Sequence, residues 1–137
     1  MQHKMRLIRA NQVSVEKMEE FLMHNENVKK DGLMKHGYVM ELNGKIEGCF
    51  VLEEMDNEMY WLKQLYITKN EAARLPVLLE SILVLAKEQH AKTVYVHSHQ
   101  PVVDIILDAL QFHPQKEDSF VDKYEKQEGN WWSYQVS

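Results

Sequence analysis

Residues 38–52 read YVMELNGKIEGCFVL, in which two apolar segments stand on either side of an Asn-Gly pair. Asn43 and Gly44 both tolerate the positive φ angles of a type I′ turn, and such a pair between apolar segments is a strong signal of a β-hairpin. A polar turn and a further strand-like segment, residues 59–67, come next. The sequence therefore predicts an antiparallel meander of three strands, residues 38–42, 45–52 and 59–67.

The segment before this meander is predicted to form a strand and a helix. Residues 5–9 alternate in type as a strand does. Ser14 stands before an acidic first turn, and apolar residues follow at helical spacing, so a helix is expected to begin after Ser14 and to end near Asn25. Residues 26–36 are mostly charged or polar, and their pattern fits either a loop or a short second helix.

The segment after the meander alternates between helices and strands. Residues 77–89 carry apolar side chains around so much of a helix surface that this helix must lie against a sheet. Residues 92–97 are typical of a buried strand, and Pro101 suits the first turn of another helix. Residues 120–124 and 131–136 resemble a closing strand pair. The chain of 137 residues is thus expected to form a single α+β domain, residues 1–137.

Composition and charge limit the class of protein. The formal net charge of −5 argues against binding to nucleic acid, whose phosphates attract clustered basic residues. No stretch reaches the roughly 18 consecutive apolar residues of a membrane span, and residues 1–4 lead into a strand rather than a signal peptide. A cytoplasmic protein that binds no membrane is therefore expected. The only cysteine, Cys49, lies in a predicted strand and is expected to be a buried thiol.

The order of the predicted elements resembles the fold of the GCN5-related N-acetyltransferases over nearly the whole chain. The most specific points are Leu65, Tyr66 and Ile67, which run into a helix like that family's fourth strand, and residues 107–112, which occupy the place of its closing Tyr-Glu-Lys-Leu-Gly-Phe motif. The resemblance implies a mixed sheet flanked by helices, in which the fourth and fifth strands splay apart. It also implies an acyltransferase that uses acetyl-CoA.

The resemblance further implies where acetyl-CoA would bind. Its pantetheine arm would lie between the splayed strands, against main-chain groups of Tyr66, Ile67 and Thr68. Its pyrophosphate would lie on the following turn, where backbone N–H groups and the start of a helix meet the negative charge. This turn, together with the position of a family asparagine, corresponds to Ala72, Ala73, Arg74, Leu75 and Gln100. Both loop glycines of the family are replaced here, by Ala73 and Leu75.

Two interpretations of residues 68–76 stay open. A helix that begins at Pro76 would leave the preceding residues free to contact phosphates, because proline suits the first turn of a helix. Thr68 and Glu71 have the spacing of a capping box, however, which would start the helix at Lys69 and leave no phosphate loop. In that case Pro76 would only kink the helix.

Amine acetylation requires a base for the amine and an acid for the departing thiolate. The resemblance places these roles on a carboxylate of the fourth strand and on a late tyrosine, but residues 59–67 contain no acid and the tyrosine position is Leu107. His97 and His99 are candidate substitutes, since an imidazole transfers protons near neutral pH, and Ser98 could hold a water. The alternative is that these are polar residues at a strand end.

Glu53 and Glu54 end the third strand, and Glu53 is a further candidate base because a carboxylate there could reach a cleft. The alternative is that both are solvated turn carboxylates. A metal site is not expected, because no third histidine or carboxylate follows His97 and His99 at ligand spacing.

Trp131 and Trp132 are neighbours in the predicted last strand and therefore point to opposite faces of the sheet. At most one of them is expected to enter the core. The other is expected to be exposed or to lie in a contact between two copies of the chain, that is, a homodimer.

Two functions are compatible with the sequence. The first is an acetyl-CoA-dependent N-acyltransferase that acts by direct transfer on a small-molecule or peptide amine. It needs no single side chain, because positioning and water-mediated proton transfer can carry such a reaction. The second is a non-catalytic domain of the same fold that binds acyl-CoA as a ligand or contacts another protein, which the missing carboxylate, tyrosine and glycines favour.

Overall fold

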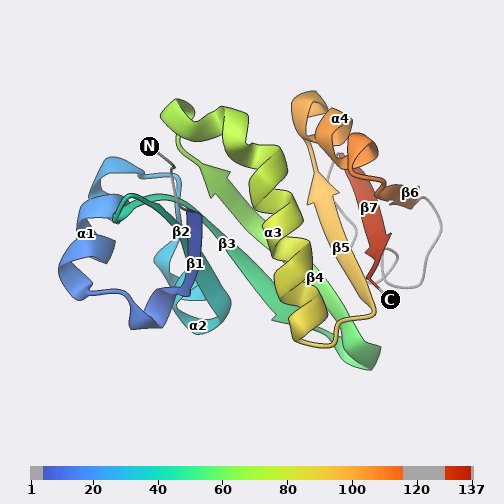
Figure 1. Ribbon diagram of the computed structural model, residues 1–137, viewed down its shortest axis with the longest axis horizontal. Coiled ribbons are helices and arrows are strands. Elements are labelled where there is room, and N and C mark those ends of the chain that lie inside the picture. The colour runs from blue at the N-terminus through green and yellow to red at the C-terminus, as the bar shows by residue number, and fades with distance from the viewer. Residues whose placement is uncertain (1–4, 116–128, 137) are drawn as a thin grey trace. The chain divides into compact units, whose positions relative to one another are not determined.

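A computed structural model describes residues 5–115 and 129–136 of the chain. These residues form two compact units. Unit 1 comprises residues 5–53 and 63–78, and unit 2 comprises residues 54–62, 79–115 and 129–136. Figure 1 labels the helices and strands of both units. No helix in the described residues is long and apolar enough to cross a membrane.

The hairpin predicted from the Asn-Gly pair forms the centre of unit 1. Strand β2 (Gly37–Leu42) turns into β3 (Lys45–Glu54) through Asn43 and Gly44, whose φ angles are 55° and 80°. Two positive φ angles fit a type I′ turn, so the hairpin is confirmed. Strand β1 (Met5–Arg9) pairs antiparallel with β2, and β4 (Met59–Ile67) follows β3 in the strand order.

Helices α1 (Val15–His24) and α2 (Lys30–His36) cover one face of β2 and β3 in unit 1. Ser14 caps α1, since its hydroxyl accepts a hydrogen bond from the Lys17 N–H at 3.3 Å. The short second helix is thus the correct interpretation of residues 26–36. A short 3₁₀ turn, η1 (Ala10–Gln12), joins β1 to the loop before α1. The core on this face consists of Ala10, Met18, Phe21, Leu33, Val39, Ile46 and Cys49.

Strand β3 contains a β-bulge near its start. Glu41 of β2 pairs with Ile46, but the preceding residue Met40 pairs with Gly48, so the register leaves Glu47 without a partner in β2. A bulge adds one residue to a strand and takes its side chain out of simple alternation. Ile46 is buried in the core, and the neighbouring Glu47 is half-buried.

Cys49 is buried in β3, which confirms the predicted strand thiol. Burial raises the pKa of this thiol to about 12, because the apolar core disfavours the charged thiolate. The native protein therefore holds its one cysteine in the unreactive, protonated form.

Strands β4, β5 and β7 form the sheet of unit 2. Strand β5 (Thr93–Ser98) pairs in parallel with β4, from Met59 with Thr93 to Leu62 with Val96, and antiparallel with β7 (Asn130–Gln135). Strand β6 (His113–Gln115) pairs with the other edge of β7. The strand order of the described residues is β1-β2-β3-β4-β5-β7-β6, a mixed sheet as predicted. The strand predicted at residues 120–124 lies outside the described residues.

Helix α3 (Leu75–Glu88) begins in unit 1 and continues into unit 2, where η2 (Asp56–Glu58) and α4 (Pro101–Ala109) also lie. Pro101 takes the first position of α4, as predicted. The apolar residues of α3 are less completely buried than the sequence predicts, because Val77 and Val84 are exposed. The buried side of α3 consists of Leu75, Leu78, Leu79, Ile82 and Ala86.

Trp131 and Trp132 are neighbours on β7, but both are buried. The indole N–H of Trp132 donates to Oδ1 of Asp104 at 2.8 Å. The ring of Trp131 lies beside Trp61, with 5.5 Å between centroids. The expectation that one tryptophan would be exposed is therefore wrong, because unit 2 supplies a partner for each. A homodimer stays a prediction, without an exposed tryptophan to support it.

Candidate functional site

The backbone of β4 is irregular at the place where the resemblance puts the cofactor arm. Gln64 has a φ angle of 54° inside the strand, a conformation that costs a non-glycine residue about 1 to 2 kcal/mol. Strained residues of this kind cluster at functional sites. The side chain of Gln64 lies against α2, since a Cβ added to Gly32 would be 3.3 Å from its amide. The regular strand is thus interrupted just before Tyr66.

The side chain of Tyr66 holds the end of β4 against α1. Its hydroxyl donates a hydrogen bond to Oδ1 of Asn25, and its ring meets Phe21 edge-on with 6.2 Å between centroids. Any cofactor contact of Tyr66 would therefore use its main chain. The N–H of Thr68 already donates to the carbonyl oxygen of Glu47 at 2.9 Å. The N–H of Thr68 is therefore not available to a cofactor.

The predicted pyrophosphate turn is wound into a 3₁₀ helix, η3 (Lys69–Arg74). Helix α3 then begins at Leu75, so Pro76 lies in its first turn, close to the predicted start. The capping-box interpretation correctly predicted that a helical segment begins at Lys69. It was wrong that Thr68 caps this segment. The hydroxyl of Thr68 makes no cap hydrogen bond and donates instead to Oε1 of Glu47 at 3.0 Å.

Arg74, the predicted charged contact for pyrophosphate, is engaged with a neighbour. Its Nε lies 2.7 Å from Oε1 of Glu71, one turn earlier. Both side chains are partly exposed, so the pair contributes little to stability. Ala72 and Ala73 are exposed between them. Arg74 would therefore have to share its charge between Glu71 and a bound phosphate.

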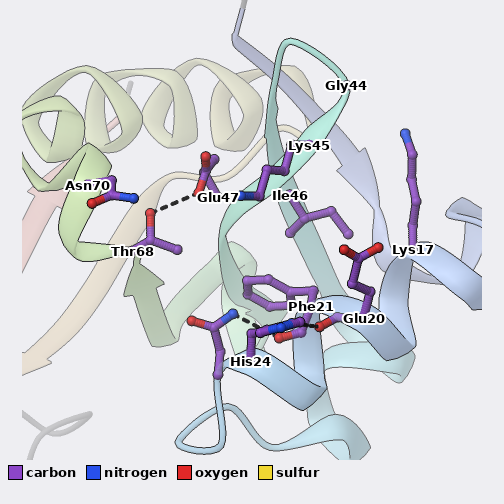
Figure 2. A pocket seen from close by; sticks show the side chains of 11 residues that line it. Lys17, Glu20, Phe21, His24, Gly44, Lys45, Ile46, Glu47, Thr68 and Asn70 are labelled. Carbon is purple, nitrogen blue, oxygen red and sulfur yellow. Dashed lines mark hydrogen bonds between the residues drawn. The ribbon is translucent and has the colours of Figure 1, made fainter.

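A cavity of about 410 Å³ lies in unit 1, on the side of α1. Figure 2 shows side chains around it from α1, from the start of β3 and from Thr68 and Asn70, which follow β4. Of the predicted site residues only Thr68 lines this cavity. Its lining consists of Lys17, Glu20, Phe21, His24, Asn25, Gly44, Lys45, Ile46, Glu47, Thr68 and Asn70.

The candidate histidines lie together in unit 2. The rings of His97 and His99 are 5.7 Å apart between centroids, and His97 also packs on Trp131 at 5.1 Å. His97 is partly buried, and His99 is exposed. Ser98 is buried between them, and its hydroxyl donates to the carbonyl oxygen of Gln100 at 3.2 Å. It is therefore engaged in the turn into α4 and does not offer a free water site.

Gln100, the position of the family asparagine, is the N-cap residue of α4. Its N–H donates to the hydroxyl of Ser98 at 3.3 Å, and its carbonyl oxygen accepts from Val103 and Asp104. These hydrogen bonds stabilise the first turn of α4. A ligand could therefore contact Gln100 through its exposed side chain.

The remaining catalytic candidates are poorly placed for proton transfer. Oε1 of Glu53 forms an ion pair with Nζ of Lys63 at 2.7 Å in unit 1. Glu54 is exposed. Leu107, at the position of the family tyrosine, is fully buried. Among the described residues no group of three or more His, Cys, Asp or Glu could hold a metal ion.

Sequence reasoning missed the polar residues around the cavity, Glu47 and His24 above all. The sequence gives no clear signal of them, because residues 49–52 of the same strand are all apolar and would bury both faces. The structure shows that Ile46 and Cys49, three positions apart, belong to one core cluster. It also shows that Glu47 is the bulged residue between them.

Neither a model of a known protein family nor a curated protein matches the sequence. Solved structures do match. The chain is similar to an acetyltransferase of the GNAT (GCN5-related N-acetyltransferase) family from Staphylococcus aureus Mu50, with a TM-score of 0.73 and 19% identity over 98% of this chain and 100% of that one. It is also similar to N-acetylglutamate synthase from Neisseria gonorrhoeae in complex with coenzyme A and N-acetyl-glutamate, with a TM-score of 0.72 and 10% identity over 100% of this chain and 36% of that one.

A third similar structure is an IAA acetyltransferase from Bacillus cereus, with a TM-score of 0.66 and 13% identity over 98% of this chain and 99% of that one. At identities this low, likeness establishes the fold and not the activity. The chain therefore has the GNAT fold, as the order of its elements implied.

Proposed function

We propose that this chain is an acetyl-CoA-dependent N-acetyltransferase, a divergent GNAT member that transfers the acetyl group directly to an amine of a small molecule or peptide. The observation that carries the proposal is the positive φ angle of Gln64 in β4, next to the predicted cofactor residues, in a chain that follows the GNAT fold over 98% of its length. N-acetylglutamate synthase, one of the similar structures, contains coenzyme A. The proposal treats residues 1–137 as one domain.

The residues in place fit acetyl-CoA in part. Main-chain groups of Tyr66 and Ile67 would align the pantetheine arm, since the side chain of Tyr66 is bonded to Asn25 and that of Gln64 lies against α2. Arg74 and the first turn of α3 would supply positive charge for the pyrophosphate. Glu71 opposes this, because its carboxylate already neutralises Arg74. Weak cofactor binding is the expected result.

In the proposed reaction the amine nitrogen attacks the thioester carbonyl, so that a C–N bond forms as the C–S bond breaks. The nitrogen loses a proton, and the departing thiolate gains one. His97 and His99 are the candidates for moving these protons, because an imidazole can both accept and donate near neutral pH. Glu53 is a poorer candidate, because it is paired with Lys63.

A second function is favoured by the same geometry. A domain that binds acyl-CoA without catalysis needs neither a free carboxylate nor a tyrosine at position 107. Leu107 is enclosed in the core, and Glu53 is in an ion pair. Cofactor binding is common to both functions, and only turnover separates them.

The test is calorimetric titration of the protein with acetyl-CoA and with coenzyme A, on wild type and two variants. Arg74→Gln is expected to weaken binding about tenfold, which is the loss of about 1.4 kcal/mol from one charged contact. Glu71→Gln should tighten binding, because it removes a negative charge and frees Arg74. Lys87→Gln, an exposed residue in the last turn of α3, is the matched control and should change nothing.

Absence of binding at millimolar coenzyme A would overturn both functions. If Arg74→Gln and the control Lys87→Gln change the affinity for coenzyme A equally, the pyrophosphate does not bind at this turn. Once binding is established, mass spectrometry of a panel of amines incubated with acetyl-CoA decides between transfer and binding alone. An acetylated amine identifies the enzyme, and its absence across the panel favours the non-catalytic domain.

A further inference from the structure

The cavity in unit 1 has an apolar floor and polar walls (Figure 2). Phe21 of α1 and Ile46 of β3 form the floor, and both belong to the buried core. Its volume of about 410 Å³ lies in the range of pockets that hold small ligands, roughly 300 to 1,000 Å³. The residues of the predicted pyrophosphate turn, 72–75, do not line it. The cavity is therefore a site separate from most of the proposed cofactor contacts.

Glu47 places a half-buried carboxylate in the wall of this cavity. Glu47 is the bulged residue of β3, next to Ile46, and has no partner in β2. One carboxylate oxygen accepts a hydrogen bond from the hydroxyl of Thr68 at 3.0 Å. An ionised carboxylate has about four lone-pair sites, so Glu47 can accept further hydrogen bonds from a ligand.

His24 adds a second hydrogen-bond acceptor. Its Nδ1 lies 2.9 Å from the carbonyl oxygen of Glu20. Because a carbonyl can only accept, this contact requires the proton on Nδ1, and in the neutral ring Nε2 is then an acceptor. Asn25 adds little, since its amide nitrogen donates to the Phe21 carbonyl and its oxygen accepts from Tyr66.

The two lysines that line the cavity do not offset these acceptors. Nζ of Lys17 lies 3.3 Å from Oε2 of Glu41, whose side chain is only 7% exposed, so the charge of Lys17 is already neutralised within the protein. Lys45 is exposed at the β2–β3 turn and solvated. Glu20 is likewise an exposed and solvated charge, so Glu47 is the half-buried charged group among the lining residues. The interior of the cavity thus favours a ligand that donates hydrogen bonds and carries positive charge.

We infer that this cavity binds a small primary amine with an apolar body. The ammonium group, with its three N–H donors, would bind to Glu47, and the apolar body would cover Phe21 and Ile46. A charged hydrogen bond to a partly desolvated carboxylate is the strongest contact that such a site offers. Binding needs no acetyl-CoA, so the inference stands or falls independently of the proposed transferase activity.

Titration with hexylamine tests the inference, monitored by calorimetry and by backbone amide shifts in NMR spectra of the full chain without coenzyme A. Hexylamine is expected to bind at least about tenfold more tightly than 1-hexanol or hexanoate, because only hexylamine carries the ammonium group. The shifts should concentrate at Phe21, Glu47 and Thr68.

Glu47→Gln keeps the size of the side chain and an oxygen that can accept from Thr68, but removes the charge. It is expected to weaken hexylamine binding about tenfold and to leave 1-hexanol unaffected. Glu80→Gln, at an exposed position of α3 outside the lining, is the matched control and should bind hexylamine as wild type does. Circular dichroism of both variants checks that they fold.

Three results would overturn the inference. One is absence of hexylamine binding at millimolar concentration. Another is equal affinity for hexylamine and 1-hexanol, which would make the site merely apolar. The third is binding that Glu47→Gln and Glu80→Gln change to the same extent, which would place the amine elsewhere.

Discussion

The ends of β4 and β5 are built in opposite ways. At the end of β4, in unit 1, Gln64 holds a strained φ angle of 54°, and half-buried polar side chains stand beside a cavity. At the end of β5, in unit 2, Ser98 is buried, its hydroxyl is bonded to Gln100, and Gly129 lies against its carbonyl group. The first arrangement leaves polar groups for a ligand, whereas the second uses them for the fold. The difference indicates that substitutions should affect stability at β5 and binding at β4.

The largest effect is expected from Gly129→Ala. Gly129 has a φ angle of 125°, and an added Cβ would lie 2.4 Å from the carbonyl oxygen of Ser98 and 3.0 Å from the ring of His97. Backbone strain and steric overlap together should lower the free energy of unfolding by about 3 kcal/mol. Urea denaturation measures the change.

The matched control for this substitution is Gly44→Ala in the β2–β3 turn. Gly44 also has a positive φ angle, 80°, but an added Cβ would meet no atom within 4 Å. Only backbone strain remains, and the expected loss is about 1 kcal/mol. Equal losses for the two variants would contradict the close packing at the end of β5.

The next effect concerns the core beneath the polar end of β4. Burial raises the pKa of Cys49 to about 12, so the folded state favours the neutral thiol. Stability from this group is complete below the unfolded pKa near 9.0 and is lost as the pH rises toward 12. Between pH 8 and pH 10 the free energy of unfolding should fall by about 1.4 kcal/mol from Cys49 alone.

Denaturation curves of wild type and Cys49→Ala at both pH values isolate this contribution from the other titrating groups. The wild type should lose more stability than the variant, by about that amount. An identical pH dependence of the two proteins would show that water reaches the thiol and that the core of unit 1 is not dry beneath its polar end.

The smallest effect is expected from Gln64→Gly. Glycine adopts a positive φ angle without strain, which gains about 1 to 2 kcal/mol, but it loses more backbone entropy on folding, which costs about 0.5 to 1 kcal/mol. A net gain of about 0.5 kcal/mol is expected by thermal denaturation. A clear loss of stability would mean that the Gln64 side chain packs on α2 strongly enough to outweigh its strain.

Much of the fold could be predicted from local sequence signals. Asn43 and Gly44 fix the hairpin, Ser14 starts α1 and Pro101 starts α4, because each acts through its own backbone or through a neighbour in sequence. The prediction that at most one of Trp131 and Trp132 is buried was wrong, because the partner of Trp132, Asp104, is distant in the sequence. Local signals cannot report such a contact.

The candidate site was harder to predict for the same reason. Thr68 has the spacing of a cap residue, yet its hydroxyl donates to Glu47, which is twenty-one positions away on another strand. Arg74 and Glu71 were both named as residues of the turn, but their ion pair depends on the 3₁₀ winding between them. The sequence identifies the polar groups, and the tertiary structure decides which of them are already used.

The buried thiol of Cys49 has a practical consequence for enzymology. It is the only cysteine of the chain, and in the native state it is both enclosed and protonated. Dyes such as Ellman's reagent react with thiolates, so the folded protein should give almost no colour of its own. In a continuous spectrophotometric assay, nearly all of the colour would then come from free coenzyme A. A slow rise in colour without substrate would indicate that the protein is unfolding.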